Sequence, residues 1–173
     1  TVDGITYRDT AGDPLPAIAD PRALYLNARQ GMASSDFSGV TLLLPKDSGL
    51  NELAEQINGA WQKDCSLFFS IEEVPQEEFD QRIASGSYTI ALAPIRAEGG
   101  SVYQMLQQFG SAESGLTGWS DPIYLQRLDE STRQTGRTRC QLLSQCEHQL
   151  LEGCSVVPLL NQQKRLLVAD GIS

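Results

Sequence analysis

Between residues 39 and 95 the chain alternates between two kinds of apolar pattern, and this alternation limits the possible folds more than any other feature. Residues 39–45, 65–74 and 87–95 are short apolar runs, typical of strands that are covered on both faces. The segment after the first run instead repeats its apolar residues at the spacing of one helix face: Leu50, Leu53, Ala54, Ile57, Ala60 and Trp61. We expect Trp61 to lie in the core at the end of that buried face.

A second helix is predicted after the second apolar run. It starts at Pro75, and Glu77 and Glu78 lie in its first turn, where negative charge suits the helix dipole. Phe79 and Ile83 form its core stripe. Three strands joined by two helices predict βαβ units in a parallel sheet, with right-handed crossovers.

The segments on both sides of this core are predicted to contain few strands. Residues 1–20 are rich in Gly, Pro and Asp and are expected to be an irregular entry segment. Asp20 followed by Pro21 predicts the start of a helix that ends near Gln30. A further helix is expected over residues 101–109.

The C-terminal third predicts two more helices and the end of the sheet. A Gly-Trp-x-x-Pro turn at residues 118–122 opens a short helix with three predicted core residues: Ile123, Leu125 and Leu128. A longer helix is predicted from a second apolar set: Leu142, Leu143, Cys146, Leu150 and Leu151. Residues 159–168 should then supply one or two strands. Together these segments predict one α/β domain over residues 1–173, a mixed sheet of about five strands with a parallel βαβαβ core and helices on both faces.

Charge and motifs exclude several functional classes. The formal net charge is −9, from 22 acidic and 13 basic residues, whereas nucleic-acid binding needs a cationic surface. No stretch approaches the ~18 consecutive apolar residues of a membrane span. The GxSxG, P-loop, HExxH and GxGxxG motifs are all missing from the sequence. The pairs of adjacent glutamates are better explained by a solvated strand end and by the first turn of a helix than by acid–base catalysis. We therefore expect the protein to be no enzyme and to bind no cofactor.

The four cysteines are Cys65, Cys140, Cys146 and Cys154. Their spacing contains no CxxC pair and the single histidine, His148, is expected to be solvated, so a metal site is not predicted. Cys146 lies on the apolar face of its helix and should pack as a small hydrophobic residue. A disulfide from Cys140 or Cys146 to Cys154 stays open in an oxidising compartment.

Several segments, taken in order, carry a resemblance to a known family. They read DPRALYL (20–26), TLLL (41–44), FDQRIASGSYTIALAPI (79–95), GWSDPIYLQRL (118–128) and CEHQLLEGCSVVPLL (146–160). This order resembles the second lobe of family-5 extracellular solute-binding proteins, the oligopeptide and dipeptide receptors of ABC importers. The resemblance runs from about residue 20 to residue 170.

The resemblance implies a part of a larger receptor. In that family the second lobe is inserted between two parts of lobe I, so both ends of this chain would lie at the interlobe hinge. The family closes on an extracellular solute, here predicted to be a peptide, and delivers it to an ABC permease in the membrane. It is lipid-anchored on the extracellular face of the membrane or periplasmic, and it performs no chemistry. The alternative is a ligand-sensing domain of a transcriptional regulator that uses the same module.

Ligands of open parallel sheets bind outside the carboxyl ends of the strands, and the family places its second-lobe contacts in the same loops. The residues after the first strand are Lys46, Asp47, Ser48 and Asn51. All four are also good turn and helix-capping residues, and for Ser48 capping alone is the favoured interpretation. Residues 73–75 follow the second strand.

The loop after the third strand supplies the remaining candidates: Ala93, Ile95, Arg96 and Glu98. Backbone groups around Ala91 and Ala93 are expected to pair with an extended peptide. Receptors of this family that anchor a peptide amine carry an aspartate near the position of Ile95, so the ligand class stays open, with Glu98 as a displaced substitute.

Arg96, Glu98 and Trp119 also have plain structural explanations. Arg96 and Glu98 either bind a charged ligand group or pair with each other at the surface. Trp119 is expected to pack its turn against the following helix, with stacking on a ligand as the alternative.

Overall fold

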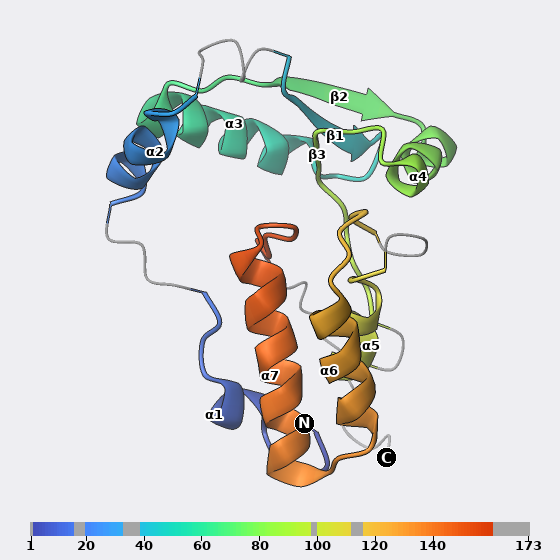
Figure 1. Ribbon diagram of the computed structural model, residues 1–173. Coiled ribbons are helices and arrows are strands. Elements are labelled where there is room, and N and C mark those ends of the chain that lie inside the picture. Colours follow the sequence, from blue (N-terminus) through green and yellow to red (C-terminus); the bar gives the residue numbers. More distant parts are fainter. Residues whose placement is uncertain (1, 16–19, 33–38, 98–99, 112–115, 161–173) are drawn as a thin grey trace, which may run out of the picture.

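The computed structural model describes residues 2–15, 20–32, 39–97, 100–111 and 116–160 (Figure 1). Its elements form two groups. The sheet group contains the strands with α2, α3 and α4, and the helical group contains α1, α5, α6 and α7 (Figure 1). The chain passes from the sheet group to the helical group directly after β3.

The sheet group is built on three parallel strands. β1 (Thr41–Pro45) lies in the centre, with β2 (Ser70–Val74) on one side and β3 (Ile90–Ala91) on the other. The register pairs Thr41 with Ser70 and Leu42 with Ile90. The predicted parallel βαβαβ core is therefore confirmed.

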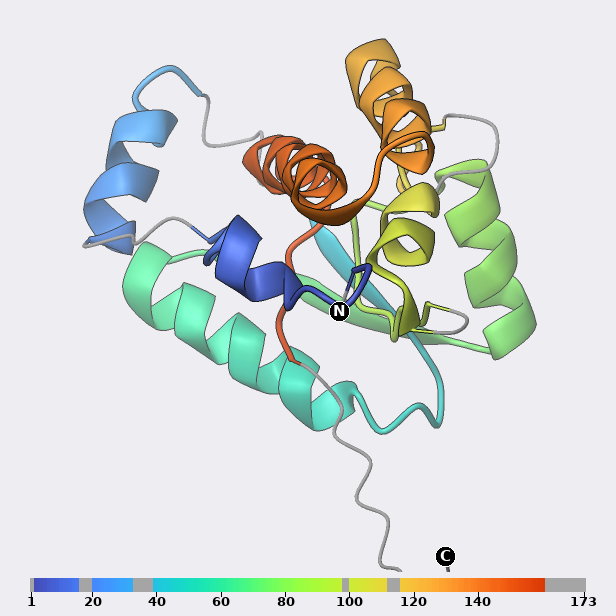
Figure 2. The same ribbon diagram turned by 90° about the horizontal axis from the view of Figure 1, so that it is seen from below.

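Helices cover both faces of this sheet because β1 is apolar on both sides. Leu42 and Leu44 pack with α3 (Asn51–Cys65) in one buried cluster. Leu43 points to the opposite face and packs with Phe79 of α4 (Gln76–Ser85). Seen from below, α3 and α4 lie on opposite sides of the strands (Figure 2). Period-two alternation along a strand thus places α3 and α4 on opposite faces.

The outer strands are shorter than predicted. β2 starts at Ser70 rather than at residue 65, because α3 continues to Cys65 and an α3 side chain holds the backbone of Phe69. The Asn58 amide donates to the Phe69 carbonyl (3.0 Å) and accepts from the Phe69 N–H (3.2 Å). β3 pairs only with Leu42 and Leu43 of β1. Residues 159 and 160 have no regular secondary structure, and the rest of the strands predicted over 159–168 lies outside the described residues.

The helical group has a hydrophobic core of its own. α5 (Val102–Gln107), α6 (Pro122–Thr132) and α7 (Gly136–Glu152) pack around Tyr124 and Leu143, which are fully buried. Three predicted helices are confirmed here: the one over residues 101–109, the one opened by the turn at 118–122 and the one through Leu142–Leu151. The helix predicted after Asp20 is confirmed as α2 (Pro21–Arg29), and its N-cap Asp20 accepts the N–H of Ala23.

The N-terminal segment differs from the irregular stretch that was predicted. α1 (Tyr7–Ala11) packs along α7, and Tyr7 is buried in the helical core. The Tyr7 hydroxyl donates to the Glu147 carboxylate (3.0 Å), and the Arg8 guanidinium forms a bidentate ion pair with the same carboxylate. Contacts to a helix about 140 residues away thus order a segment that has little local propensity for structure.

Two apolar faces were predicted incorrectly. Ile123 and Leu125 of α6 are 56% and 39% exposed, because Tyr124 and Leu128 occupy the buried face instead. Trp61, predicted to be core, is 41% exposed at the C-terminal end of α3. Its ring contacts the ring of Phe69 edge to face, with centroids 4.9 Å apart.

All four cysteines have free thiols, so the disulfide left open by the sequence is not formed in this structure. Cys140 and Cys146 are buried in the helical core, as predicted for Cys146. Burial raises the pKa of the Cys146 thiol to about 11, so this thiol is protonated at neutral pH. His148 is half-buried rather than fully solvated. None of the described helices combines the length and apolar character needed to cross a bilayer.

Candidate functional site

The carboxyl ends of β1, β2 and β3 meet at one edge of the sheet, because parallel strands all point the same way. The Lys46 N–H donates to the Val74 carbonyl (2.7 Å), which ties the first loop to the end of β2. This edge is where the sequence placed its candidate ligand-binding residues.

The first loop is a tight, exposed turn. Asp47 and Gly49 have positive φ angles of 58° and 73°. The Ser48 hydroxyl accepts the N–H of Leu50 (3.3 Å), which is itself the N-cap residue of α3. Ser48 therefore closes the turn before the helix and does not cap α3 as the sequence favoured, since α3 has no side-chain cap hydrogen bond. Lys46 and Asn51 are exposed beside this turn. The turn therefore presents four polar side chains to solvent at the sheet edge.

The third loop leads from β3 into the helical group. Ala93 and Arg96 are exposed, whereas the half-buried Ile95 packs against the helical core. The Arg96 carbonyl accepts a hydrogen bond from Gln108 (3.1 Å). Because Ile95 packs among apolar side chains, a carboxylate at this position would lose hydration. Glu98 lies outside the described residues.

Trp119 belongs to the helical group and packs within it. Its ring meets the ring of Tyr124 edge to face, with centroids 5.1 Å apart, and it is half-buried against the helical core. This is the packing role that the sequence favoured. Stacking of Trp119 on a ligand stays a prediction.

The adjacent carboxylates of β2 do not form an acid–base pair. Glu72 faces α4, where Arg82 donates to both of its oxygens (2.6 and 3.1 Å). These hydrogen bonds lower the pKa of the Glu72 carboxyl below its ordinary value. Glu73 is exposed. Since neighbouring strand residues point to opposite faces, the two carboxylates have different surroundings and Glu72 serves as an ion-pair partner.

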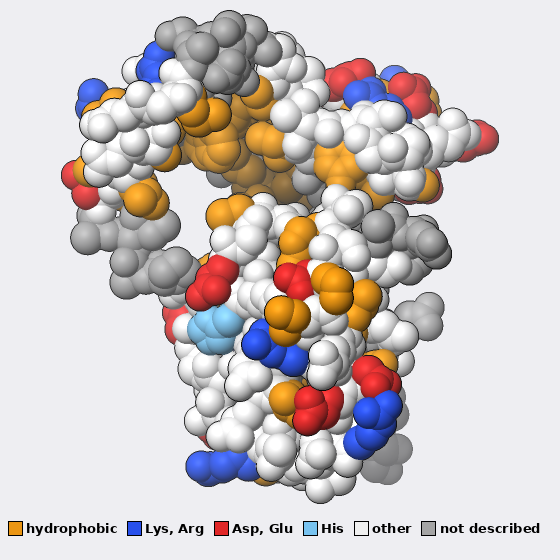
Figure 3. All heavy atoms as spheres, in the orientation of Figure 1, with side chains coloured by type: hydrophobic (Ala, Val, Ile, Leu, Met, Phe, Trp, Pro, Cys, Tyr) orange, Lys and Arg blue, Asp and Glu red, His pale blue; other side chains and the backbone are white. Residues whose placement is uncertain are grey.

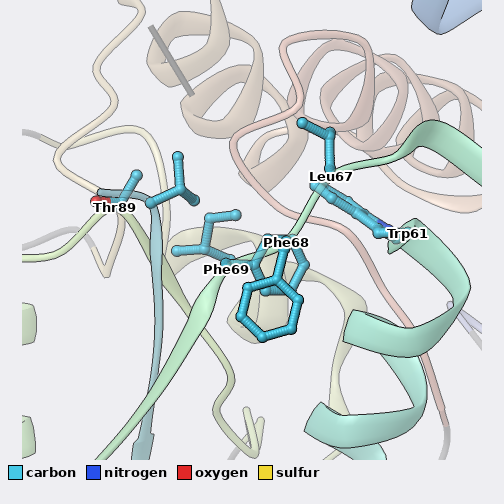
Figure 4. A pocket seen from close by; sticks show the side chains of 7 residues that line it. Trp61, Leu67, Phe68, Phe69 and Thr89 are labelled. Carbon is cyan, nitrogen blue, oxygen red and sulfur yellow. The ribbon is translucent and has the colours of Figure 1, made fainter. Parts of the chain in front are cut away.

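An apolar pocket that the sequence did not predict lies at the opposite edge, where the strands begin. It has a volume of about 240 Å³ and is lined by seven residues: Val40, Trp61, Leu67, Phe68, Phe69, Thr89 and Ile90 (Figure 4). The adjacent aromatic residues Phe68 and Phe69 were a possible signal, but they lie in different environments in the segment before β2. Phe69 is buried and Phe68 is 67% exposed.

The described residues contain no cluster of three or more His, Cys, Asp or Glu side chains suited to a metal ion. The groups brought together at the carboxyl edge are instead exposed polar side chains, one exposed strand edge and apolar loop residues. Such a surface can bind a solute through hydrogen bonds and charge.

Comparison with known proteins gives a consistent class for this fold. No protein-family model and no curated protein sequence matches the chain. Solved structures do match. The substrate-binding domain of an oligopeptide ABC transporter from Bacillus anthracis has a TM-score of 0.72 at 18% identity, over 88% of this chain and 30% of the other.

Two further structures agree. The murein tripeptide binding protein MppA of Escherichia coli has a TM-score of 0.68 at 15% identity, over 84% of this chain and 30% of that protein. A peptide-binding protein of a peptide ABC transporter has a TM-score of 0.71 at 15% identity, over 91% of this chain and 73% of the other. The fold is that of a lobe of the periplasmic peptide-binding proteins. The chain spans about 30% of the length of most of these proteins, as a single lobe would.

Proposed function

We propose that this chain is the second lobe of a two-lobed substrate-binding component of an ABC transporter, and that its solute is a peptide. In this proposal residues 1–173 form one domain whose ends lie at the hinge to lobe I of the same polypeptide. The similarity in fold to peptide-binding proteins supports the proposal, and the free edge of β3 is the observation that carries it.

The outer edge of β3 has backbone groups available for a peptide. β3 is the last strand on its side of the described sheet. Leu92 donates its N–H to the Leu43 carbonyl (2.8 Å), so the backbone groups of Leu92 point toward β1. Successive residues of a strand direct these groups to opposite edges, so those of Ala91 and Ala93 point outward. An extended peptide can hydrogen-bond there as an added strand, whatever its sequence.

The candidate side chains have distinct roles in this proposal. Lys46 and Arg96 provide positive charge for carboxylate groups of the peptide, and Asp47 and Glu98 provide negative charge for its amino groups. The other contacts come from Ser48, Asn51, Ala93, Ile95 and Trp119. No residue is assigned a catalytic role, no cofactor or nucleic acid is involved, and the free energy of binding shifts the equilibrium between open and closed lobes.

The receptor is placed on the extracellular face of the membrane, lipid-anchored, or in the periplasm, where it delivers the peptide to its permease. We would purify the full-length protein gently from its own cells and denature it in native mass spectrometry. A ladder of released peptide masses is the expected result. A single discrete non-peptide mass would refute the peptide assignment.

A substitution at Ala93 tests whether a peptide pairs with the edge of β3. Ala93→Pro removes the outward N–H, and the extended residue before it is compatible with proline. One lost hydrogen bond of about 1 kcal/mol lowers the affinity of the full-length protein for a released peptide by about fivefold. Ala93→Ser keeps the N–H and should bind as the unmodified protein does. Equal affinities for all three proteins would contradict pairing at β3.

The second candidate is a ligand-sensing domain of a transcriptional regulator that uses the same module. Fractionation of the source cells separates the two functions. Recovery of the full-length protein from the cell surface or periplasm supports transport, and recovery from the DNA-bound cytoplasmic fraction supports regulation.

A further inference from the structure

Asn58 is the asparagine of this chain that has glycine as its next residue. The other asparagines, Asn27, Asn51 and Asn161, are followed by alanine, glutamate and glutamine. An asparagine before glycine deamidates faster than other asparagines, because glycine has no side chain to hinder attack of its backbone nitrogen on the asparagine amide. The pair Asn58-Gly59 therefore has a strong intrinsic tendency to lose ammonia.

The fold does not require glycine at position 59. Gly59 lies in the interior of α3, where glycine destabilises a helix relative to alanine. A Cβ added there would have no described atom within 4 Å, and Gly59 does not have a positive φ angle. Neither packing nor backbone geometry in the described part of the chain therefore explains why a glycine follows Asn58.

The Asn58 side chain has a structural role in the folded chain. It is 9% exposed, and its amide joins α3 to the segment before β2 through the two hydrogen bonds to the Phe69 backbone (3.0 and 3.2 Å). That segment lines the apolar pocket (Figure 4). Hydrophobic side chains gather on the face beneath the sheet group in the space-filling view (Figure 3). Loss of the amide would therefore loosen the start of β2 beside a largely apolar surface.

The folded structure also protects the pair from reaction. Deamidation requires the Gly59 nitrogen to reach the side-chain carbon of Asn58. A helical backbone instead directs the N–H of Gly59 to the carbonyl four residues earlier. The two hydrogen bonds to Phe69 hold the Asn58 amide in place as well. The reaction therefore needs α3 to open locally at residues 58 and 59.

We propose that Asn58-Gly59 is a deamidation site that reacts only when α3 opens, and that the reaction prevents α3 from closing again. The Gly59 nitrogen bonds to the Asn58 Cγ, the Cγ–Nδ2 bond breaks, and the amide group leaves as ammonia with the proton of the Gly59 N–H. Water then opens the succinimide ring to aspartate or isoaspartate.

Both products are incompatible with the contact to Phe69. A carboxylate at position 58 cannot donate to the Phe69 carbonyl, and it places a negative charge where the amide was buried. Isoaspartate also adds a carbon atom to the backbone of the helix. This inference stands whether or not the chain is a transport receptor, because it depends only on α3 and its contact with the segment before β2.

Peptide mapping by mass spectrometry tests whether the fold protects the site. The 173-residue chain is incubated at neutral pH, in buffer and in urea that unfolds it. Deamidation of Asn58 should be slower in buffer by about tenfold or more, because only the open fraction reacts. In urea, Gly59→Ala should slow the reaction at Asn58 to the rates of Asn27 and Asn51. Equal rates in buffer and urea would overturn protection by the fold, and a slow Asn58 in unfolded chain would overturn the site itself.

Asn58→Asp tests the consequence, because it has the charge of the product on an ordinary backbone. Hydrogen exchange of residues 67–70 should become about tenfold faster, since the lost hydrogen bond and the buried charge weaken the contact to Phe69. Gln56→Glu makes the same amide-to-acid change at an exposed position of α3 and should leave exchange unchanged. Failure of Asn58→Asp to fold, while Gln56→Glu folds, would support the proposal. Unchanged exchange in Asn58→Asp would refute the claim that deamidation keeps α3 from closing.

Discussion

Tyr124 is the side chain around which the helical group closes. It is fully buried, its hydroxyl donates to the Leu106 carbonyl (2.7 Å), and its ring contacts Trp119. Burial raises the pKa of this phenol well above its ordinary value. Its ring also lies against the backbone at Gly110, where an added Cβ would come within 2.4 Å of the Tyr124 ring. Glycine is needed here for two reasons, since Gly110 also has a φ of 84°.

Gly110→Ala should therefore be far more destabilising than an ordinary glycine substitution. The left-handed backbone costs about 1–2 kcal/mol and overpacking against Tyr124 adds about 1–3 kcal/mol. Gly118→Ala is the matched control, because its φ is 64° and no described atom lies within 4 Å of the added Cβ. Urea unfolding of both variants measures the difference. Equal losses of unfolding free energy would mean that the close approach to Tyr124 is unimportant.

At the scale of elements, α6 shows how a helix start is encoded locally. The Asp121 carboxylate accepts the N–H groups of Ile123 (2.7 Å) and Tyr124 (3.1 Å), and Pro122 follows at the first helical position. The hydrogen bond from Tyr124, and then that from Ile123, lowers the pKa of Asp121 below its ordinary value of 3.8. The face that this helix buries was decided separately, by packing of Tyr124 and Leu128 on α5 and α7.

The N-cap of α6 should make stability depend on acid pH. Because the folded Asp121 carboxyl has the lower pKa, its stabilising contribution is complete above the unfolded value and is lost as the pH falls through the folded value. Asp121→Asn keeps a capping oxygen but does not titrate, so its urea midpoint should fall less steeply than that of the unmodified chain below about pH 4. Glu130→Gln changes an exposed carboxylate of the same helix and should follow the unmodified profile. Identical slopes for Asp121→Asn and the unmodified chain would contradict this assignment.

At the scale of the whole molecule, the two groups have separate hydrophobic clusters. A few contacts connect them. Tyr88 of the sheet group donates its hydroxyl to the Leu116 carbonyl (3.1 Å), and Ile95 packs against the helical core. With separate cores, the groups are expected to open as distinct cooperative units.

Leu143→Ala tests this independence. Leu143 is fully buried in the helical core, and its truncation costs about 2–5 kcal/mol. Native-state hydrogen exchange should become faster in α6 and α7, while β1 keeps its protection. Leu142→Ala, on a half-buried position of the same helix, should have a much smaller effect. Equal acceleration in β1 and α7 would show one cooperative unit.

Parts of the candidate site were predictable and others were not. Parallel strands bring Lys46, Asp47 and Ser48 to the same edge as Ala93, which follows from strand order and local pattern alone. The side chain of Ile95 turns into the helical core, and Trp119 packs on Tyr124, because of contacts that no local spacing reveals. The exposed apolar pocket also needed the three-dimensional structure, since it joins Trp61 of α3, Ile90 of β3 and residues from the segments before all three strands.

The sequence by itself determined the βαβαβ core, the helix start at Asp20 and the helix opened by the turn at residues 118–122. Those features depend on the period of apolar residues and on hydrogen bonds between near neighbours. Tertiary structure decided that Val2 and Tyr7 belong to the helical core, that Ile123 and Leu125 face outward, and that β3 pairs over two residues. The reason is physical: burial free energy comes from surfaces far apart in the chain. An amphipathic helix such as α6 buries the side chains that face its neighbours in the folded protein, and those neighbours are set by the whole fold.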